Sequence, residues 1–370
     1  ARFDAVPGGA FDTVSGGTTT VGASGNGVGA SGVVLTSVSG DLSFTDLDVY
    51  ADAGAGLRAS GTTAYTGSAG LRIAVGAGVG TIEATGGPAV DVTQATLGLP
   101  LSSIRSTGSA TTGVALSSVL GTFSAGAASS ISGVGAAGTS FLVASSNATI
   151  TYNGTINATA GKGVDLTSNT GSTISFTGAL TLSTGSSTAF NATGGGTVSA
   201  TNTTSTLTTT TGTALNVQNT TIGASNLEFR SITANGGANG IVLQNTGSSG
   251  GLKVRGDNAS TTKGGNATGG TIRNMVGADG AVAGNGIYLE NTSNVLLQRM
   301  QLNDFQNSAI RGLGVSGFTL QYSTINGVSG DSSAATEGAV TFGTVIPGAN
   351  GLSGGTNLVD GCVVRGARRR

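Results

Sequence analysis

The chain has 370 residues and a formal net charge of −1, and only 9% of its residues are charged. It contains 67 glycines, no Trp, no His and a single cysteine, Cys362. This composition excludes an intramolecular disulfide, a cysteine-based metal site and an imidazole base, and the thin spread of Lys and Arg disfavours a nucleic-acid partner.

Long tracts of Gly, Ala, Ser, Thr and Asn raise the possibility of a disordered chain. Hydrophobic residues nevertheless make up 37% of the sequence, and they recur in short regular groups. Chains that remain disordered lack the apolar residues needed to offset the entropy of ordering, so this pattern favours a folded protein. No run of about 18 apolar residues occurs, so we expect no membrane-spanning helix.

A short motif recurs along the chain, consisting of a small residue, an apolar residue, any residue and a second apolar residue. The first apolar positions are, in chain order, Leu71, Val90, Val114, Phe141, Val164, Phe190, Leu215, Ile241, Ile287, Ile310 and Val340. Most neighbouring positions are 23 to 27 residues apart, a period typical of solenoid repeats. The step from Ile241 to Ile287 is close to two periods, so we expect a coil with a degenerate anchor there and a protruding loop over 247–284.

Each period contains further strand signals, such as 226–229 after Leu215 and 294–297 after Ile287. These segments alternate apolar and polar residues over three to five positions, and Gly, Asn, Ser and Asp separate them, which favours short strands joined by turns over helices. The pattern predicts an all-β solenoid of roughly 15 coils with three short strands per coil, continuous over residues 1–370. Asn, Ser and Val at equivalent positions are expected to stack as ladders.

The segment 285–295 reads Asn-Gly-Ile-Tyr-Leu-Glu-Asn-Thr-Ser-Asn-Val, and 239–245 is a weaker copy of it. This sequence resembles the repeat of the right-handed parallel β-helix family, which pectate-lyase-like proteins share with large bacterial surface proteins. The first half, rich in Ala, Gly, Ser and Thr, is closest in character to the repetitive autotransporter-like members. The resemblance implies a right-handed parallel β-helix that acts outside the cell or at its surface as a non-catalytic structural or adhesive protein. A pectate-lyase-like enzyme acting on carbohydrate, or an ice-binding protein, is the alternative.

Acidic residues bear on the enzyme alternative. Asp91, Asp165 and Asn216 occupy the same place in different periods, between two inward apolar residues. Lyases of the family use acidic residues, calcium and a basic residue on such a face, so the resemblance implies that this row is where catalysis would occur. Ala115, Leu142 and Asn191 interrupt the row, and catalysis needs a cluster of perturbed charges. We therefore expect no enzymatic activity.

Asp41, Asp46, Asp48 and Asp52 form the main acidic concentration. Because Leu47 and Val49 alternate with them, Asp46 and Asp48 are predicted to point outward together. Two adjacent carboxylates with backbone oxygens suit calcium, which is the only cofactor that the sequence suggests. The alternative is ordinary solvated surface charge.

Three further motifs have both a functional and a structural interpretation. Arg255-Gly256-Asp257 matches a cell-adhesion tripeptide, although tripeptides recur by chance. The tract Thr197–Thr213 would suit an ice-binding array or simply a half-exposed strand. Nine Asn-x-Ser/Thr triplets are either glycosylation acceptors or a consequence of composition.

The ends of the chain lead to the partner prediction. Residues 1–17 contain no amphipathic helix that would cap a solenoid, and the sequence stops soon after a strand near Val359. Uncovered coils are sheet edges open to pairing, so we expect a piece of a longer chain or a subunit that stacks end to end into a fibre. Contacts with cell-surface components or polysaccharide are the other expected partners. The run Arg368–Arg370 is either native or an added tail.

Overall fold

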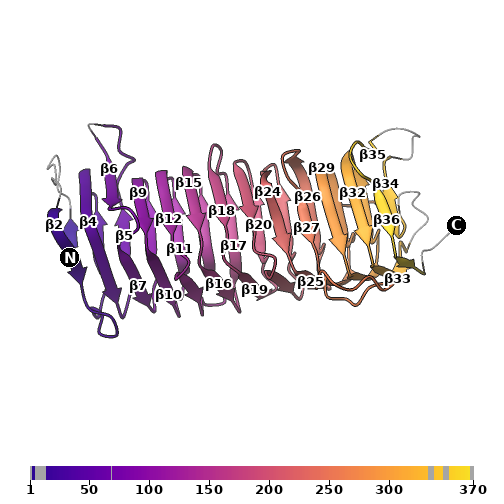
Figure 1. Cartoon of the computed structure of the whole chain (residues 1–370), viewed down its shortest axis with the longest axis horizontal. Helices are drawn as coiled ribbons and strands as arrows, with labels where there is room; N and C mark the ends of the chain where they lie inside the picture. Colours follow the sequence, from indigo (N-terminus) through magenta and orange to yellow (C-terminus); the bar gives the residue numbers. More distant parts are fainter. Residues whose placement is uncertain (1, 5–13, 68, 332–336, 345–349, 367–370) are drawn as a thin grey trace. The chain divides into compact units, whose positions relative to one another are not determined.

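The structure, a computed structural model, describes residues 2–4, 14–67, 69–331, 337–344 and 350–366. The run Arg368–Arg370 lies outside these residues. Described secondary structure is entirely β, and it forms a parallel β-solenoid of about 12 turns, which confirms the predicted fold class (Figure 1). No helix in the described part of the chain has the length and apolar character that crossing a membrane requires. The chain divides into two compact units, residues 1–179 and 180–370, which are treated separately below.

Unit 1 builds each coil from three strands, and each strand pairs in parallel with its counterpart in the next coil. The first sheet contains β1 (Arg2–Asp4), β3 (Val33–Thr36), β5 (Leu57–Ser60), β8 (Val90–Thr93), β11 (Thr112–Ser117), β14 (Thr139–Ala144) and β17 (Lys162–Thr167). The second contains β6 (Leu71–Val75), β9 (Thr96–Leu101), β12 (Leu120–Ala125), β15 (Asn147–Tyr152) and β18 (Thr173–Phe176). The third contains β7 (Thr81–Thr85), β10 (Ser103–Thr107), β13 (Ser130–Ser132) and β16 (Thr155–Ala158). The long strands β2 (Val14–Val21) and β4 (Gly40–Ala51) run from the second sheet into the third.

Unit 2 repeats the arrangement. Its first sheet contains β20 (Phe190–Thr193), β23 (Leu215–Gln218), β26 (Ile241–Gly247), the start of β29 (Ile287–Gln298), β31 (Ile310–Leu313) and β34 (Val340–Phe342). The second contains β21 (Thr197–Ala200), β24 (Thr221–Phe229), β27 (Leu252–Val254), the end of β29, β32 (Val315–Gln321), β35 (Leu352–Ser353) and β36 (Leu358–Asp360). The third contains β19 (Leu180–Gly185), β22 (Thr206–Thr209), β25 (Ser231–Asn235), β28 (Gly270–Met275), β30 (Met300–Phe305), β33 (Thr324–Ser329) and β37 (Val363–Val364).

The core of each unit lies inside its coils, where alternate residues of every strand point inward. In unit 1 the fully buried ring of Phe141 packs against Tyr152 and Phe176, with ring centroids 5.2 Å away in both cases. In unit 2 Phe190 and Phe229 pack edge to face at 6.1 Å. The predicted anchors from Leu71 to Ile310 are therefore buried in the interior, whereas the last one, Val340, is half-buried.

One corner of the described coils depends on residues with a left-handed backbone. At the end of the first-sheet segment φ is positive in coil after coil, for example 51° at Ser145, 57° at Ser168 and 51° at Asn219, and 53° at Asn245 within β26. This conformation turns the chain sharply into the second strand, and Asn tolerates it better than most residues. In unit 2 the corner amides form a ladder, because Asn245 Nδ2 donates to Asn219 Oδ1 at 2.8 Å and Asn291 Nδ2 donates to Asn245 Oδ1 at 2.9 Å.

Two predicted details of the repeat are wrong. Ile241 pairs directly with Ile287, so the stretch between them is one coil with inserted loops rather than two coils with a degenerate anchor. Leu71 lies in the second sheet, and the first-sheet strand of its coil is β5, which precedes an insertion at 61–70. These insertions enlarge individual coils, which is why the chain forms about 12 turns instead of 15. Within 247–284 the structure contains β27 and β28, together with connecting segments at 255–269 and 276–286.

Candidate functional site

Asp46 and Asp48 lie on the outer side of β4, because their neighbours Leu47 and Val49 are fully buried. Thr18 Oγ1 donates to Asp46 Oδ2 at 2.7 Å, and the backbone N–H of Thr81 donates to Asp48 Oδ1 at 2.9 Å. Among the described residues, no third acidic side chain completes a group with these two within 4.8 Å. Calcium binding at Asp46 and Asp48 stays a prediction.

The predicted acidic row exists on the first sheet of unit 1, where Asp91, Ala115, Leu142 and Asp165 stand in register. Each carboxylate has its own cation, since Arg58 Nε lies 3.5 Å from Asp91 Oδ2 and Lys162 Nζ lies 2.6 Å from Asp165 Oδ2. Burial raises the pKa of Asp91, and the charge of Arg58 opposes that shift. The two carboxylates thus belong to separate ion pairs, with Ala115 and Leu142 between them.

Asn216 lies on the first sheet of unit 2 and begins a different arrangement. Its Nδ2 donates to Asn191 Oδ1 at 2.8 Å, and its Oδ1 accepts from Gln218 Nε2 at 2.7 Å. In the next coils Gln244 Nε2 donates to Glu290 Oε2 at 2.6 Å. We call this set of four amide side chains and one carboxylate the amide strip: Asn191, Asn216, Gln218, Gln244 and Glu290. The strip depends on strand register, so composition alone could not reveal it.

Ranks of hydroxyl side chains cover two other sheets. On the second sheet of unit 1, two parallel ranks are Thr122, Thr149 and Thr173, and Ser124, Thr151 and Ser175. On the third sheet of unit 2, two more are Thr181, Thr206 and Ser231, and Ser183, Thr208 and Thr233. All twelve side chains are exposed or half-exposed. Only part of the tract Thr197–Thr213 contributes, because β21 and β22 belong to different sheets and Thr209 is buried.

The tripeptide Arg255-Gly256-Asp257 begins the 255–269 loop, and both of its charges bind within the protein. Arg255 forms a bidentate pair with Glu228, at 2.6 Å from Nε to Oε2 and 3.0 Å from Nη2 to Oε1. Asp257 Oδ1 lies 3.0 Å from Arg299 Nε. A receptor that recognised both charges would have to break these pairs, which favours the structural interpretation of the tripeptide.

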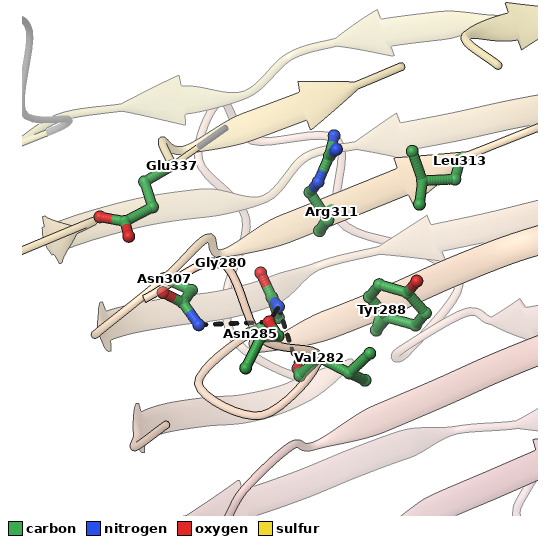
Figure 2. A pocket seen from close by; sticks show the side chains of 9 residues that line it. Gly280, Val282, Asn285, Tyr288, Asn307, Arg311, Leu313 and Glu337 are labelled. Atoms are coloured by element: carbon green, nitrogen blue, oxygen red, sulfur yellow. Dashed lines mark hydrogen bonds between the residues drawn. The ribbon is translucent and has the colours of Figure 1, made fainter. Parts of the chain in front are cut away.

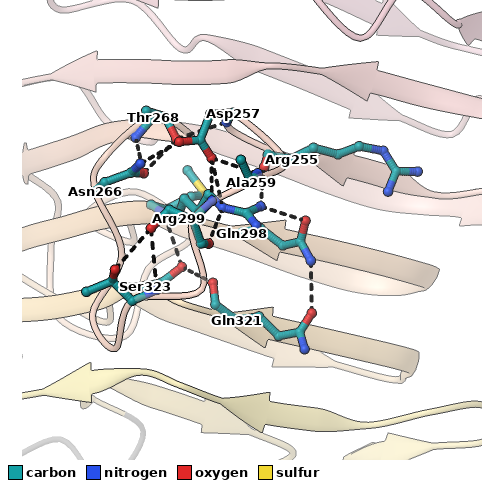
Figure 3. Close-up of polar contacts among 12 residues, drawn as sticks. Arg255, Asp257, Ala259, Asn266, Thr268, Gln298, Arg299, Gln321 and Ser323 are labelled. Atoms are coloured by element: carbon teal, nitrogen blue, oxygen red, sulfur yellow. Dashed lines mark hydrogen bonds and ion pairs between the residues drawn. The ribbon is translucent and has the colours of Figure 1, made fainter.

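Arg299 holds the 255–269 loop against the coils (Figure 3). Its side chain is only 4% exposed. Besides pairing with Asp257, its Nε donates to Ser260 O at 2.6 Å and its Nη1 donates to Arg255 O at 2.7 Å. The guanidinium carbon also lies 5.5 Å from the centroid of the Tyr322 ring. The buried Arg299 side chain, between β29 and β30, therefore binds the turn 255–260 at Arg255, Asp257 and Ser260.

The Asp257 carboxylate predicts a pH dependence of this loop. Hydrogen bonds from the backbone of Ala259, from Asn266 and from Ser260, together with the charge of Arg299, lower its pKa from 3.8 to about 2. Because the folded pKa lies below the unfolded one, the stabilisation is complete above pH 3.8 and is lost as the pH falls through about 2. We expect amide-exchange protection of Ala259 and Ser260 to decline with a midpoint near pH 2. Asp257→Asn should remove that transition, and a midpoint near pH 4 would contradict the assignment.

A pocket of about 140 Å³ lies beside the first sheet of unit 2, and Figure 2 shows its lining. Tyr288 and Arg311 line it, and they continue the row that runs from Asn216 through Val242. The Tyr288 hydroxyl donates to Glu290 Oε2 at 2.9 Å, and burial together with that carboxylate raises the pKa of Tyr288 to about 12. Arg311 Nη1 donates to the carbonyl of Gly343 at 2.7 Å.

An acidic group that the sequence did not reveal borders this pocket. Asp279, Asp331 and Glu337 come from three separate segments, and their carboxylate oxygens lie within 4.8 Å of one another. Glu337 also lines the pocket. No local spacing connects the three residues, so only the three-dimensional structure brings them together.

Comparisons with protein-family models, with curated proteins and with solved structures find no match to this chain.

Proposed function

We propose that the protein is a non-catalytic structural or adhesive β-solenoid at a bacterial cell surface, and that it holds polysaccharide or other cell-surface polymers along its faces. The observation that carries this proposal is the repetition of hydroxyl and amide side chains from coil to coil. Neighbouring coils of a parallel sheet lie about 4.8 Å apart, and alternate residues of a strand about 6.7 Å apart. A regular array of this kind suits a repeating polymer better than a single small molecule.

The amide strip is the best defined of these arrays. Its side chains hydrogen-bond to one another and are therefore pre-organised, which lowers the entropy cost of binding. Carboxamides both donate and accept hydrogen bonds, so they suit the hydroxyl groups of a sugar chain. Weak contacts repeated along one polymer add through avidity.

Self-association belongs to the same proposal. The last described coil of unit 2 leaves four large apolar side chains exposed, namely Leu352, Leu358, Val359 and Val364. Exposed apolar strands at a sheet edge invite pairing with another strand. We infer that a further coil covers this edge, supplied either by a longer chain or by a second copy that extends the stack into a fibre.

The test measures binding to a panel of immobilised bacterial and plant polysaccharides by the wild type and by the double variant Asn216→Ala/Gln244→Ala. We expect at least one polysaccharide to bind and the variant to bind about tenfold more weakly, because two hydrogen-bonding positions are lost. Arg230→Met, which replaces an exposed residue of unit 2 outside the hydroxyl and amide arrays, is the control and should leave binding unchanged. Lack of binding across the panel combined with monodisperse monomers in electron micrographs would overturn the proposal, as would release of sugar fragments.

The hydroxyl ranks favour one second candidate, an ice-binding protein. Two ranks of hydroxyl side chains extend over three coils of one sheet, a wider array than the Thr tract alone suggests. Thermal hysteresis that disappears in Thr149→Lys would support this candidate, and its absence in the wild type would eliminate it.

A further inference from the structure

Three acidic side chains of unit 2 meet although they are far apart in sequence. Asp279 lies in the 276–286 segment, Asp331 follows β33, and Glu337 precedes β34. Their ligand oxygens lie within 4.8 Å of one another, with Asp279 and Asp331 exposed and Glu337 half-buried. Like charges at this distance repel, so a site of this kind gains stability from a neutralising cation.

A buried amide oxygen provides an independent observation at the same place. The Asn307 residue is 2% exposed, and its Nδ2 donates to Ala278 O at 2.9 Å and to Ala283 O at 2.6 Å. Its Oδ1 is buried and accepts no hydrogen bond. A buried acceptor without a partner destabilises the fold, so such an atom indicates a ligand.

The hydrogen bonds of the Asn307 amide orient this oxygen toward the side on which Glu337 lies. Nδ2 donates to carbonyls of the turn that carries Asp279, so Oδ1 points away from that turn. Figure 2 shows the Asn307 oxygen on the side away from Asn285, and Glu337 lies on that same side. Asn307 and Glu337 line the same pocket. The backbone N–H of Asp331 donates to the carbonyl of Gln306 at 3.0 Å, which places Asp331 next to Asn307.

We propose that Asp279, Asp331, Glu337 and Asn307 Oδ1 form a calcium site. Calcium prefers oxygen ligands, combines carboxylates with amide oxygens and water, and tolerates irregular geometry, whereas Mg²⁺ requires a regular octahedron. Arg311, the basic residue of the pocket, donates from Nη1 to the carbonyl of Gly343. The bound ion links the 276–286 segment to the segments on either side of residues 332–336.

The experiment is equilibrium dialysis of the full chain against ⁴⁵Ca²⁺, with circular dichroism to check folding. We expect this site to bind calcium with a dissociation constant on the order of 10⁻⁴ M, and this binding to weaken about tenfold or more in Asp331→Asn/Glu337→Gln. Both substitutions preserve side-chain size. Asp46→Asn/Asp48→Asn is the matched control and should leave this ion in place.

Terbium luminescence locates the ion by a second route. Tyr288 lines the pocket beside Glu337, while Tyr50 neighbours Asp48 on β4. We expect tyrosine-sensitised emission from bound Tb³⁺ that Tyr288→Phe reduces severalfold and Tyr50→Phe does not. Absence of calcium binding at millimolar concentration would overturn the proposal. Binding that only Asp46→Asn/Asp48→Asn removes would overturn it too, and would assign the ion to the other acidic site.

Discussion

Replacing Phe141 with alanine is expected to lower the free energy of unfolding by about 3–5 kcal/mol. The ring is fully buried, and it contacts Tyr152 and Phe176 at 5.2 Å each. The substitution removes a large apolar side chain, leaves a cavity in a closely packed interior and abolishes two aromatic contacts. Denaturant titration should show an earlier unfolding transition, and amide exchange should accelerate most in β14, β15 and β18.

The neighbouring residue provides the control for this prediction. Leu142 lies on the same strand but points outward, between Ala115 and Asp165 of the adjoining coils. Leu142→Ala should cost less than about 1 kcal/mol, because its side chain leaves no enclosed cavity. A larger loss for Leu142→Ala than for Phe141→Ala would show that the strand faces the opposite way.

Arg299→Met is expected to destabilise unit 2 by about 3 kcal/mol and to free the 255–269 loop. The substitution retains an apolar side chain of similar length, but it removes the partner of Asp257 and the donors to Ser260 O and Arg255 O. Removing one member of a buried polar network leaves the others unsatisfied, and that loss exceeds the value of a single hydrogen bond. Hydrogen exchange should show faster exchange across 255–269 and little change in unit 1.

Arg230 provides the matched control, because it is an exposed arginine of the same unit. Arg230→Met should change stability by less than about 0.5 kcal/mol. Arg299→Lys should fall between the two, since an ammonium retains the charge but cannot reproduce the planar set of donors. Unchanged loop protection in Arg299→Met would show that the network does not hold the loop.

The interior could be predicted well from the sequence because its signal is local. An inward pair of apolar residues after a small residue identifies a first-sheet strand, and the anchors from Val90 onward all lie in that sheet. Where a coil contains an insertion, the same pattern leads to a wrong strand assignment. The 61–70 insertion makes Leu71 look like an anchor, although it belongs to the next strand of its coil. Spacing alone cannot distinguish two coils from one coil with a long loop. The step from Ile241 to Ile287 therefore predicts an extra coil that the structure does not contain.

The candidate sites could be predicted only where they repeat a local pattern. Asp46 and Asp48 point outward because their strand alternates, and Asp91 and Asp165 share a row because their coils stack in register. The ion-pair partners could not be predicted in this way, because Glu228 is remote in sequence from Arg255 and Arg299 is remote from Asp257. Asp279, Asp331 and Glu337 lie outside the strands, and no periodicity of the sequence determines that they meet.

Disulfide formation between Gln244→Cys and Glu290→Cys tests most directly whether each coil stacks on the next in register. In a Cys362→Ser background, Gln218→Cys/Gln244→Cys is the reference, because both pairs stand opposite one another in neighbouring strands. Registered Cα atoms lie about 4.8 Å apart, within the reach of a disulfide, whereas two coils separate them by about 10 Å. We expect both pairs to oxidise to similar extents without loss of folding. A disulfide in the reference pair and none between positions 244 and 290 would contradict direct stacking of these coils.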